Sequence, residues 1–183
     1  MQSDFPNRLV LKLKDTTPDH TQLHQACFLI GSNIDPVKNT RLAIQLICTR
    51  ISIHNISSVY ETKAMGSEGP NFLNCAIWVE TGLSREELVK EVIAPVETEL
   101  GRIRTANKNA PRTIDIDLII FDGNILDDNL WTYPYLAITV SEVVPETFSK
   151  ATRESLANAA GNFLRSGLAI LRDDIKTECW PRG

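Results

Sequence analysis

Three features are missing from this sequence: a signal peptide, a membrane-spanning run and a pair of cysteines spaced for a metal. The first residues, M-Q-S-D-F-P-N-R, have no apolar core, and no apolar run approaches the length of a membrane helix. We therefore expect a cytoplasmic protein without membrane contacts. The 4 cysteines show no C-x-x-C spacing, and three of them lie in apolar runs, so we interpret them as reduced and inert: Cys27, Cys48, Cys75 and Cys179.

Excess positive charge and clusters of histidine are also lacking. Lys and Arg total 19 against 23 Asp and Glu, for a formal net charge of −4, so no nucleic-acid partner is expected. His20, His24 and His54 have no metal-ligand partners nearby in the sequence, and we interpret them as surface residues. The chain has 183 residues, of which 43% are hydrophobic. This is enough to form the buried core of one domain.

Apolar periodicity predicts the elements of an α+β domain. Four strands are expected, at residues 25–31, 51–60, 73–81 and 113–121. With one helix after the first strand and one after the third, this order is that of a ferredoxin-like split βαβ fold, an antiparallel sheet with helices on one face. We divide the chain into an N-terminal extension, 1–24, in which R-L-V-L-K-L-K-D alternates like a strand, and a single domain, 25–183.

Capping residues indicate where the helices begin and end. Asp35 is the expected cap of the first helix, while a capping box at Ser84–Glu87 opens the second and Gly101 ends it. Pro95 lies inside the second helix, so we expect a kink just before it. A third helix is expected near the C-terminus, from about 151 to 171.

The stretch from Gly101 to Asp122 carries most of the candidate chemistry. Its loop is rich in basic side chains, and guanidinium groups bind phosphate oxygens bidentately: Arg102, Arg104, Lys108 and Arg112. On the strand that follows, Asp115 and Asp117 alternate with apolar residues, so both carboxylates project from one face. Paired carboxylates suit Mg²⁺, which fills its remaining positions with water and phosphate oxygens. Spacing alone favours the alternative, an ordinary solvated strand face and loop.

Four segments carry a family resemblance. They are L-I-G-S-N at 29–33, S-S-V-Y-E-T at 57–62, F-L-N at 72–74, and E-L-G-R-I-R followed by P-R-T-I-D-I-D-L-I within 99–119. In order and spacing they resemble the 6-hydroxymethyl-7,8-dihydropterin pyrophosphokinases, folate-pathway enzymes that move a pyrophosphoryl group from ATP to a pterin alcohol. The resemblance implies a Mg²⁺-dependent transferase with ATP as co-substrate and small molecules as its partners.

The resemblance also implies four overlapping groups of site residues. The pterin group is Thr62, Met65, Gly66, Phe72 and Asn74. The nucleotide group is Arg102, Arg104, Arg112 and Tyr135. Asp115 and Asp117 would hold Mg²⁺, and the catalytic residues would be Arg102, Arg112 and Asp117, the last as acceptor of the hydroxyl proton. Glu97 is either a neighbour of this cluster or part of a solvated helix face.

Three departures from the family pattern leave alternatives open. Asn109 and Ala110 replace a tryptophan and a glycine, and Tyr135 replaces a histidine. The segment 136–146 is shortened and lacks the stacking phenylalanine and the phosphate-binding arginine that the family has there. One alternative is therefore a weak or inactive relative that binds a nucleotide or pterin. The other is a pyrophosphokinase for a different bicyclic alcohol.

Overall fold

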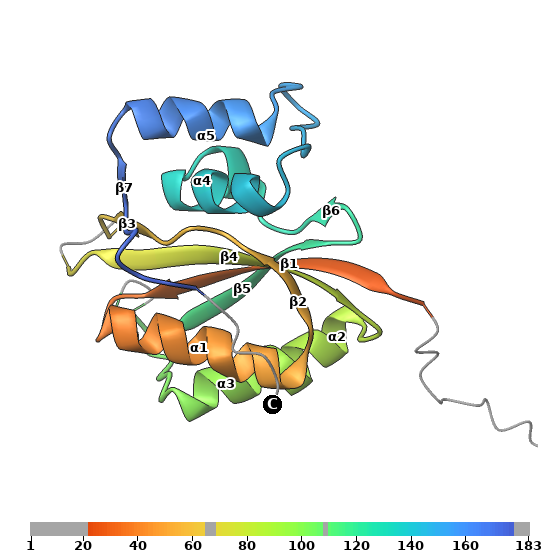
Figure 1. Ribbon diagram of the computed structural model, residues 1–183, viewed down its shortest axis with the longest axis vertical. Coiled ribbons are helices and arrows are strands. Elements are labelled where there is room, and N and C mark those ends of the chain that lie inside the picture. Colours follow the sequence, from red (N-terminus) through yellow and green to blue (C-terminus); the bar gives the residue numbers. More distant parts are fainter. Residues whose placement is uncertain (1–21, 65–68, 108–109, 178–183) are drawn as a thin grey trace, which may run out of the picture.

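The computed structural model describes residues 22–64, 69–107 and 110–177 (Figure 1). The predicted strand-like stretch in the N-terminal extension lies outside these residues, as does His20. No helix in the described ranges has both the length and the apolar character to cross a membrane. In chain order the elements are β1 (His24–Ser32), α1 (Pro36–Arg50), β2 (Ile53–Ile56), β3 (Tyr60–Thr62), β4 (Phe72–Thr81), α2 (Arg85–Glu87), the π-helix η1 (Leu88–Ile93), α3 (Ala94–Glu99), β5 (Asp115–Phe121), β6 (Asn124–Ile125), the 3-10 helix η2 (Asp128–Trp131), α4 (Pro134–Val143), α5 (Leu156–Arg165) and β7 (Ala169–Leu171).

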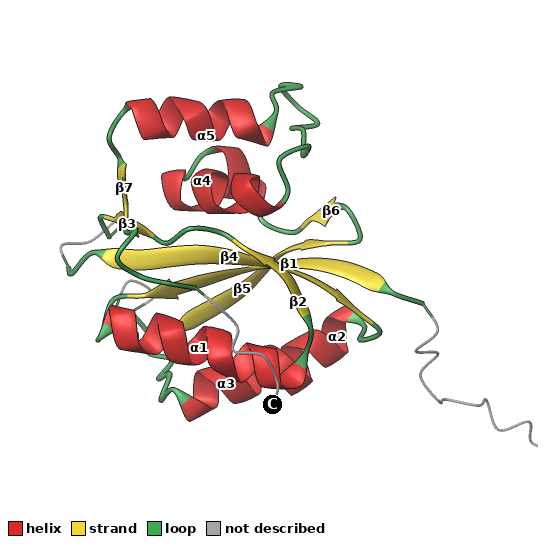
Figure 2. Cartoon of the chain, in the orientation of Figure 1, coloured by secondary structure: helices red, strands yellow, loops and turns green. Residues whose placement is uncertain are grey.

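The strands form one antiparallel sheet (Figure 2). Their order is β6-β5-β1-β4-β3-β7, and β2 pairs with β4 along the same edge as β3. The central order, β5 beside β1, β1 beside β4, and β4 beside β2 and β3, is that of the ferredoxin-like fold. The predicted α+β class is confirmed. The boundary that we placed at residue 24 between an extension and a domain stays a prediction.

Helices cover both faces of the sheet (Figure 1). Residues of β1 alternate between the two cores, because successive strand side chains point in opposite directions. Phe28 and Ile30 pack in the core beneath α1 and α3, and Cys27 and Leu29 pack in the core beneath α4 and α5. The first two helices therefore lie on one face, as predicted, and α4 and α5 add a layer on the other.

β5 follows the same alternation. Ile114 and Ile116 are buried in the core beneath α1 and α3. Asp115 and Asp117 alternate with them and so lie on the opposite face, the face that α4 and α5 partly cover. The prediction that both carboxylates share one face is confirmed.

The prediction of one continuous strand at 51–60 is wrong, because the strand is interrupted at Ser57. Its backbone N–H donates to the carbonyl of Ala76 at 2.9 Å, and its hydroxyl accepts from the N–H of the same residue at 2.8 Å. A side chain thus replaces a backbone partner in the ladder. The chain forms β2 before this point and β3 after it.

The predicted third helix is too long at both ends. The side chain of Ser155 accepts from the N–H of Asn158 and starts α5 there, and Gly167, at φ 69°, turns the chain out of the helix. Residues 169–171 then pair with β3 as β7. The segment 136–146, for which no helix was predicted, is helical for most of its length as part of α4. Its apolar residues are buried against the sheet. The apolar run is too short for periodicity to identify it as a helix.

The two predicted helix starts have different outcomes. Asp35 occupies the cap position of α1, but its side chain makes no capping bond, because the residue is left-handed with φ 43°. Asn39 instead donates to the carbonyl of Ile34 at 2.7 Å and holds this turn. The capping box of Ser84 and Glu87 is confirmed.

Pro95 is accommodated by a change of helix type. The segment before it, η1, is π-helical, and the N–H of Ala94 bonds to the carbonyl of Val89, five residues back. Proline cannot donate a backbone hydrogen bond, so a wider turn just ahead of it relieves the crowding. Gly101, at φ 69°, ends the helix as predicted.

The cysteines do not share one state. Cys27 and Cys75 are free and buried, and burial raises the pKa of the Cys75 thiol to about 12. Both are reduced, as expected. Cys48 is disulfide-bonded, so the prediction that all four thiols are reduced is wrong.

Candidate active site

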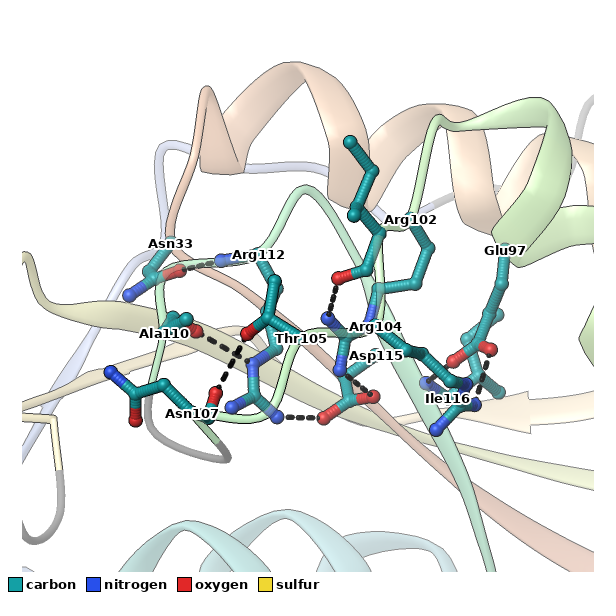
Figure 3. Close-up of polar contacts among 11 residues, drawn as sticks. Asn33, Glu97, Arg102, Arg104, Thr105, Asn107, Ala110, Arg112, Asp115 and Ile116 are labelled. Atoms are coloured by element: carbon teal, nitrogen blue, oxygen red, sulfur yellow. Dashed lines mark hydrogen bonds and ion pairs between the residues drawn. The ribbon is translucent and has the colours of Figure 1, made fainter.

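The turn after β1 clamps the backbone of Arg112 (Figure 3). The N–H groups of Asn33 and Ile34 donate to the carbonyl of Arg112 at 3.2 and 3.1 Å, and the N–H of Arg112 donates to Asn33 Oδ1 at 2.7 Å. Ser32 Oγ donates to the carbonyl of Thr113 at 2.6 Å. The end of the basic loop is thus fixed beside β5. Sequence reasoning gave Ser32 and Asn33 no role, although both lie in the L-I-G-S-N segment.

Two of the predicted arginines converge on one of the predicted carboxylates (Figure 3). Arg102 Nη2 lies 3.2 Å from Asp115 Oδ1, and Arg112 Nη1 pairs with Asp115 Oδ2. The Nε of Arg102 is buried without a hydrogen-bond partner among the described residues, and so is the hydroxyl of Thr113. Buried unpaired donors are costly, and an anionic ligand would satisfy them.

Glu97 is buried at 5% exposure, so the solvated-face alternative is wrong. Its Oε1 accepts from the N–H of Ile116 at 3.1 Å, and its Oε2 accepts from Arg104 Nη2 at 2.8 Å. β6 pairs with β5 only at Ile120 and Phe121 and does not reach Ile116, which lies between the two aspartates. The Glu97 carboxylate therefore takes the place of a strand partner for the N–H of Ile116. The guanidinium of Arg104 is thereby drawn toward the cluster.

Asp117 lies in an acidic environment. Part of the residue is exposed to solvent, but the protein around its carboxyl group removes enough water to raise the pKa to about 6. Repulsion from Asp115, Glu97 and Asp127 adds to this rise, and Arg112 opposes it. The described residues contain no group of three or more metal-ligating side chains. A divalent cation with two protein carboxylates and otherwise water or phosphate ligands fits this site, since it would relieve the repulsion.

A second group of predicted residues lies at the adjoining ends of β3 and β4. Asn74 Nδ2 donates to Thr62 Oγ1 at 3.0 Å, and both residues are buried. Gly31 lies opposite Asn74 in β1, where an added Cβ would come within 3.3 Å of Asn74 Oδ1, so glycine leaves room for this amide. The Cζ of Arg112 lies 5.8 Å from the centroid of the Phe72 ring. Met65 and Gly66 lie outside the described residues.

Comparison with known proteins identifies the family. The family model for 7,8-dihydro-6-hydroxymethylpterin-pyrophosphokinase (HPPK) matches residues 27–149, more than half of the chain. The chain belongs to the HPPK family. It is 29% identical over 136 residues to the 2-amino-4-hydroxy-6-hydroxymethyldihydropteridine pyrophosphokinase of Synechocystis, covering 68% of this chain and 69% of that protein. The corresponding Helicobacter pylori protein is 31% identical over 134 residues, covering 72% and 73%.

A solved structure supports the HPPK fold. The Plasmodium falciparum HPPK-DHPS chain, crystallised with SDX-DHP, superposes with a TM-score of 0.59 at 11% identity. The match covers 79% of this chain and 45% of that one, so this chain spans less than half of the Plasmodium protein. At such low identity the likeness shows the fold alone.

Tyr135, which the resemblance assigned to the nucleotide side, lies in the first turn of α4. Its ring stacks on that of Tyr133 with centroids 5.6 Å apart. Burial raises the pKa of Tyr135 to about 12, and the carboxylates of Asp127, Asp117 and Asp115 contribute to the rise. The phenol therefore stays protonated, and its hydroxyl can donate a hydrogen bond.

Proposed function

We propose that this protein transfers a pyrophosphoryl group from ATP to the hydroxymethyl group of 6-hydroxymethyl-7,8-dihydropterin and releases AMP. The observation that carries the proposal is the position of Arg112. Its guanidinium pairs with Asp115 and lies over the ring of Phe72, so it joins the phosphate half of the site to the pterin half. Membership of the HPPK family supports the same reaction. No observation on the described residues favours an inactive relative or a different acceptor.

Asp115 and Asp117 are the residues that would hold Mg²⁺. The acidity of the site supports this assignment, because three neighbouring carboxylates raise the pKa of Asp117, and Arg112 opposes them. When bound, the ion would supply Lewis-acid stabilisation of charge on the phosphate oxygens. The dependence on Mg²⁺ is part of the proposal.

The reaction requires little covalent work from the protein. The pterin hydroxyl oxygen attacks the β-phosphorus of ATP, the bond from that phosphorus to the α–β bridging oxygen breaks, and AMP leaves with the bridging electrons. Asp117 accepts the hydroxyl proton, a role that a carboxylate beside the reacting groups can fill. Arg102 and Arg112 stabilise the charge that develops on the transferred group, and Arg104 and Tyr135 complete the nucleotide side.

The pterin side consists of one ring and a few polar groups. The half-buried Phe72 offers a platform for a flat heteroaromatic ring, and the Asn74 amide offers a donor and an acceptor at its edge. Thr62 fixes the orientation of that amide. Met65 and Gly66 belong to the same proposed pocket.

The reaction assay tests the proposal. The protein is incubated with ATP, Mg²⁺ and 6-hydroxymethyl-7,8-dihydropterin, and AMP and pterin diphosphate are measured. Both products should form in equal amounts, and neither should form without the pterin. Formation of ADP, or of AMP without the pterin, would contradict the proposal.

Phe72→Ala should weaken binding of the pterin about ten- to a hundredfold, because the loss of an aromatic platform costs on the order of 1–3 kcal/mol. The family's second stacking ring is absent from segment 136–146, so Phe72 is expected to carry most of the stacking. Calorimetric titration with a non-hydrolysable ATP analogue present measures the effect. Unchanged tight binding would transfer the stacking role to another ring, Trp131 or Tyr135, and would remove Phe72 from the site.

A further inference from the structure

The strand β3, which carries Thr62, depends on its neighbours for its position. It has 3 residues, and such a short strand contributes few ladder bonds of its own. On one side it pairs with β4, which sets Thr62 opposite Phe72. On the other side it pairs with β7, which sets Thr62 opposite Ala169. β7 therefore converts β3 from an edge strand into an interior strand.

Arg172, the residue after β7, fastens the two strands together. Its backbone N–H donates to the carbonyl of Val59 at 2.9 Å, and its Nη1 donates to Glu61 Oε2 at 2.7 Å. Its Nε and Nη2 donate to the two carboxylate oxygens of Asp174 at 2.8 and 2.9 Å. This bidentate contact fixes the plane of the guanidinium and directs the remaining nitrogen at Glu61.

Glu61 extends this contact to the far side of the hairpin. Its Oε1 accepts from Asn71 Nδ2 at 2.8 Å. Hydrogen bonds from Asn71 and then from Arg172 lower the pKa of the Glu61 carboxyl, so it is ionised at neutral pH. Glu61 precedes Thr62 and Asn71 precedes Phe72. The chain of contacts from Arg172 thus ends at the two strand ends where the proposed pterin residues face each other.

A separate anchor holds β3 to the helical layer. The Tyr60 hydroxyl donates to Glu142 Oε1 at 2.5 Å, and the N–H of Ser58 donates to Glu142 Oε2 at 2.7 Å. Because this contact with α4 does not involve Arg172, loss of Arg172 should loosen the hairpin without detaching it from the fold.

We propose that Arg172 is a positioning residue for the acceptor side of the active site. Through Glu61 it fixes the position of the β3–β4 hairpin. Within the part of the chain that the structure describes, the hydrogen bonds that it donates go to Val59, Glu61 and Asp174, and none goes to a residue that we assign to the nucleotide or the metal. Its effect should therefore fall on the pterin and not on ATP. The inference rests on the proposed function for its kinetic consequence, and on the hairpin geometry alone for its structural one.

The test compares Arg172→Gln with the wild type by steady-state kinetics and by amide hydrogen exchange. The KM for the pterin should rise about tenfold, the effect of losing a hydrogen bond between charged groups, while kcat and the KM for ATP stay within about twofold. Amides of residues 60–62 and 72–74 should exchange faster in the ligand-free protein, and those of β1 and β5 should not. Glu61→Gln should act in the same way, and adding it to Arg172→Gln should have little further effect.

Arg50→Gln is the matched control. Arg50 also forms an ion pair, with Glu99, and its side chain is 23% exposed against 28% for Arg172, but it joins α1 to α3. This variant should leave the pterin KM unchanged. An unchanged exchange rate at residues 60–62 and 72–74 in Arg172→Gln would overturn the inference whether or not the protein turns over. If the wild type turns over and Arg172→Gln has the same pterin KM, the inference is also overturned. If the wild type does not turn over, only the proposed function is refuted.

Discussion

Asp117→Asn is expected to reduce AMP formation on the order of a thousandfold or more, because it removes a metal ligand and the proposed proton acceptor together. Asparagine has nearly the same shape as aspartate, so the fold should persist. The KM for ATP should also become less dependent on Mg²⁺. Initial rates at several Mg²⁺ concentrations measure both effects. Retained turnover would remove Asp117 from the metal site.

The same variant should gain stability relative to the wild type as pH rises, when Mg²⁺ is absent. The pKa of Asp117 is raised from 3.8 to about 6 in the folded protein, so its stabilising contribution is present below pH 3.8 and is lost as pH rises through 6. Asparagine does not titrate and avoids this loss. The difference in unfolding free energy between variant and wild type should therefore shift in favour of the variant from pH 4 to pH 7.

Asp122→Asn supplies a control of opposite sign. Hydrogen bonds from the N–H of Gln25 and from the ring of His24 lower the pKa of the Asp122 carboxyl. Its stabilising contribution is present above the unfolded pKa and is lost as pH falls through the lower folded pKa. This variant should therefore be less stable than the wild type at pH 7 and should approach it in acid. If both variants gained stability relative to the wild type as pH rises, the assignment for Asp122 would be contradicted. If both lost it, the assignment for Asp117 would be.

The strand alternation around Asp115 and Asp117 was predictable because it depends on local geometry alone. A residue in a strand faces the side opposite to its neighbour wherever the strand lies, so the shared face of the two carboxylates follows from their spacing. The capping box of Ser84 and Glu87 was predictable for the same reason, since its partners are three residues apart. Asp35 shows the limit: the left-handed backbone that prevents capping is set by the fold around it.

Contacts between distant segments were not accessible from the sequence. The bond from Asn33 to the backbone of Arg112 joins residues 79 positions apart, and the bond from Arg172 to Glu61 joins residues 111 apart. No periodicity links such positions. The pairing of β7 with β3 was missed for this reason, and residues 169–171 were placed in a helix because their apolar character fits either element.

The ion pairs of the arginines could not be predicted from the sequence either, because they depend on which carboxylates the fold brings near. The basic composition of the loop and the family resemblance suggested guanidinium groups directed at phosphate. In the structure Arg102 and Arg112 both pair with Asp115. A phosphate therefore either displaces Asp115 or binds a guanidinium nitrogen that Asp115 does not contact, such as Arg102 Nε, which has no hydrogen-bond partner among the described residues.

Arg112→Ala is expected to lower kcat by about 10²- to 10³-fold while the KM for ATP changes less than about threefold. The clamp by Asn33 fixes the Arg112 backbone, so only its side chain can leave Asp115 for the transferred phosphate. A guanidinium that reaches the phosphate when charge develops there stabilises the transition state more than bound ATP. Arg112→Lys should recover little of the loss, because an ammonium cannot replace the planar bidentate fork. Arg165→Ala, on the far end of α5, should have no effect on either parameter. A rise in the KM for ATP with kcat unchanged would show that Arg112 binds the nucleotide equally in the ground and transition states.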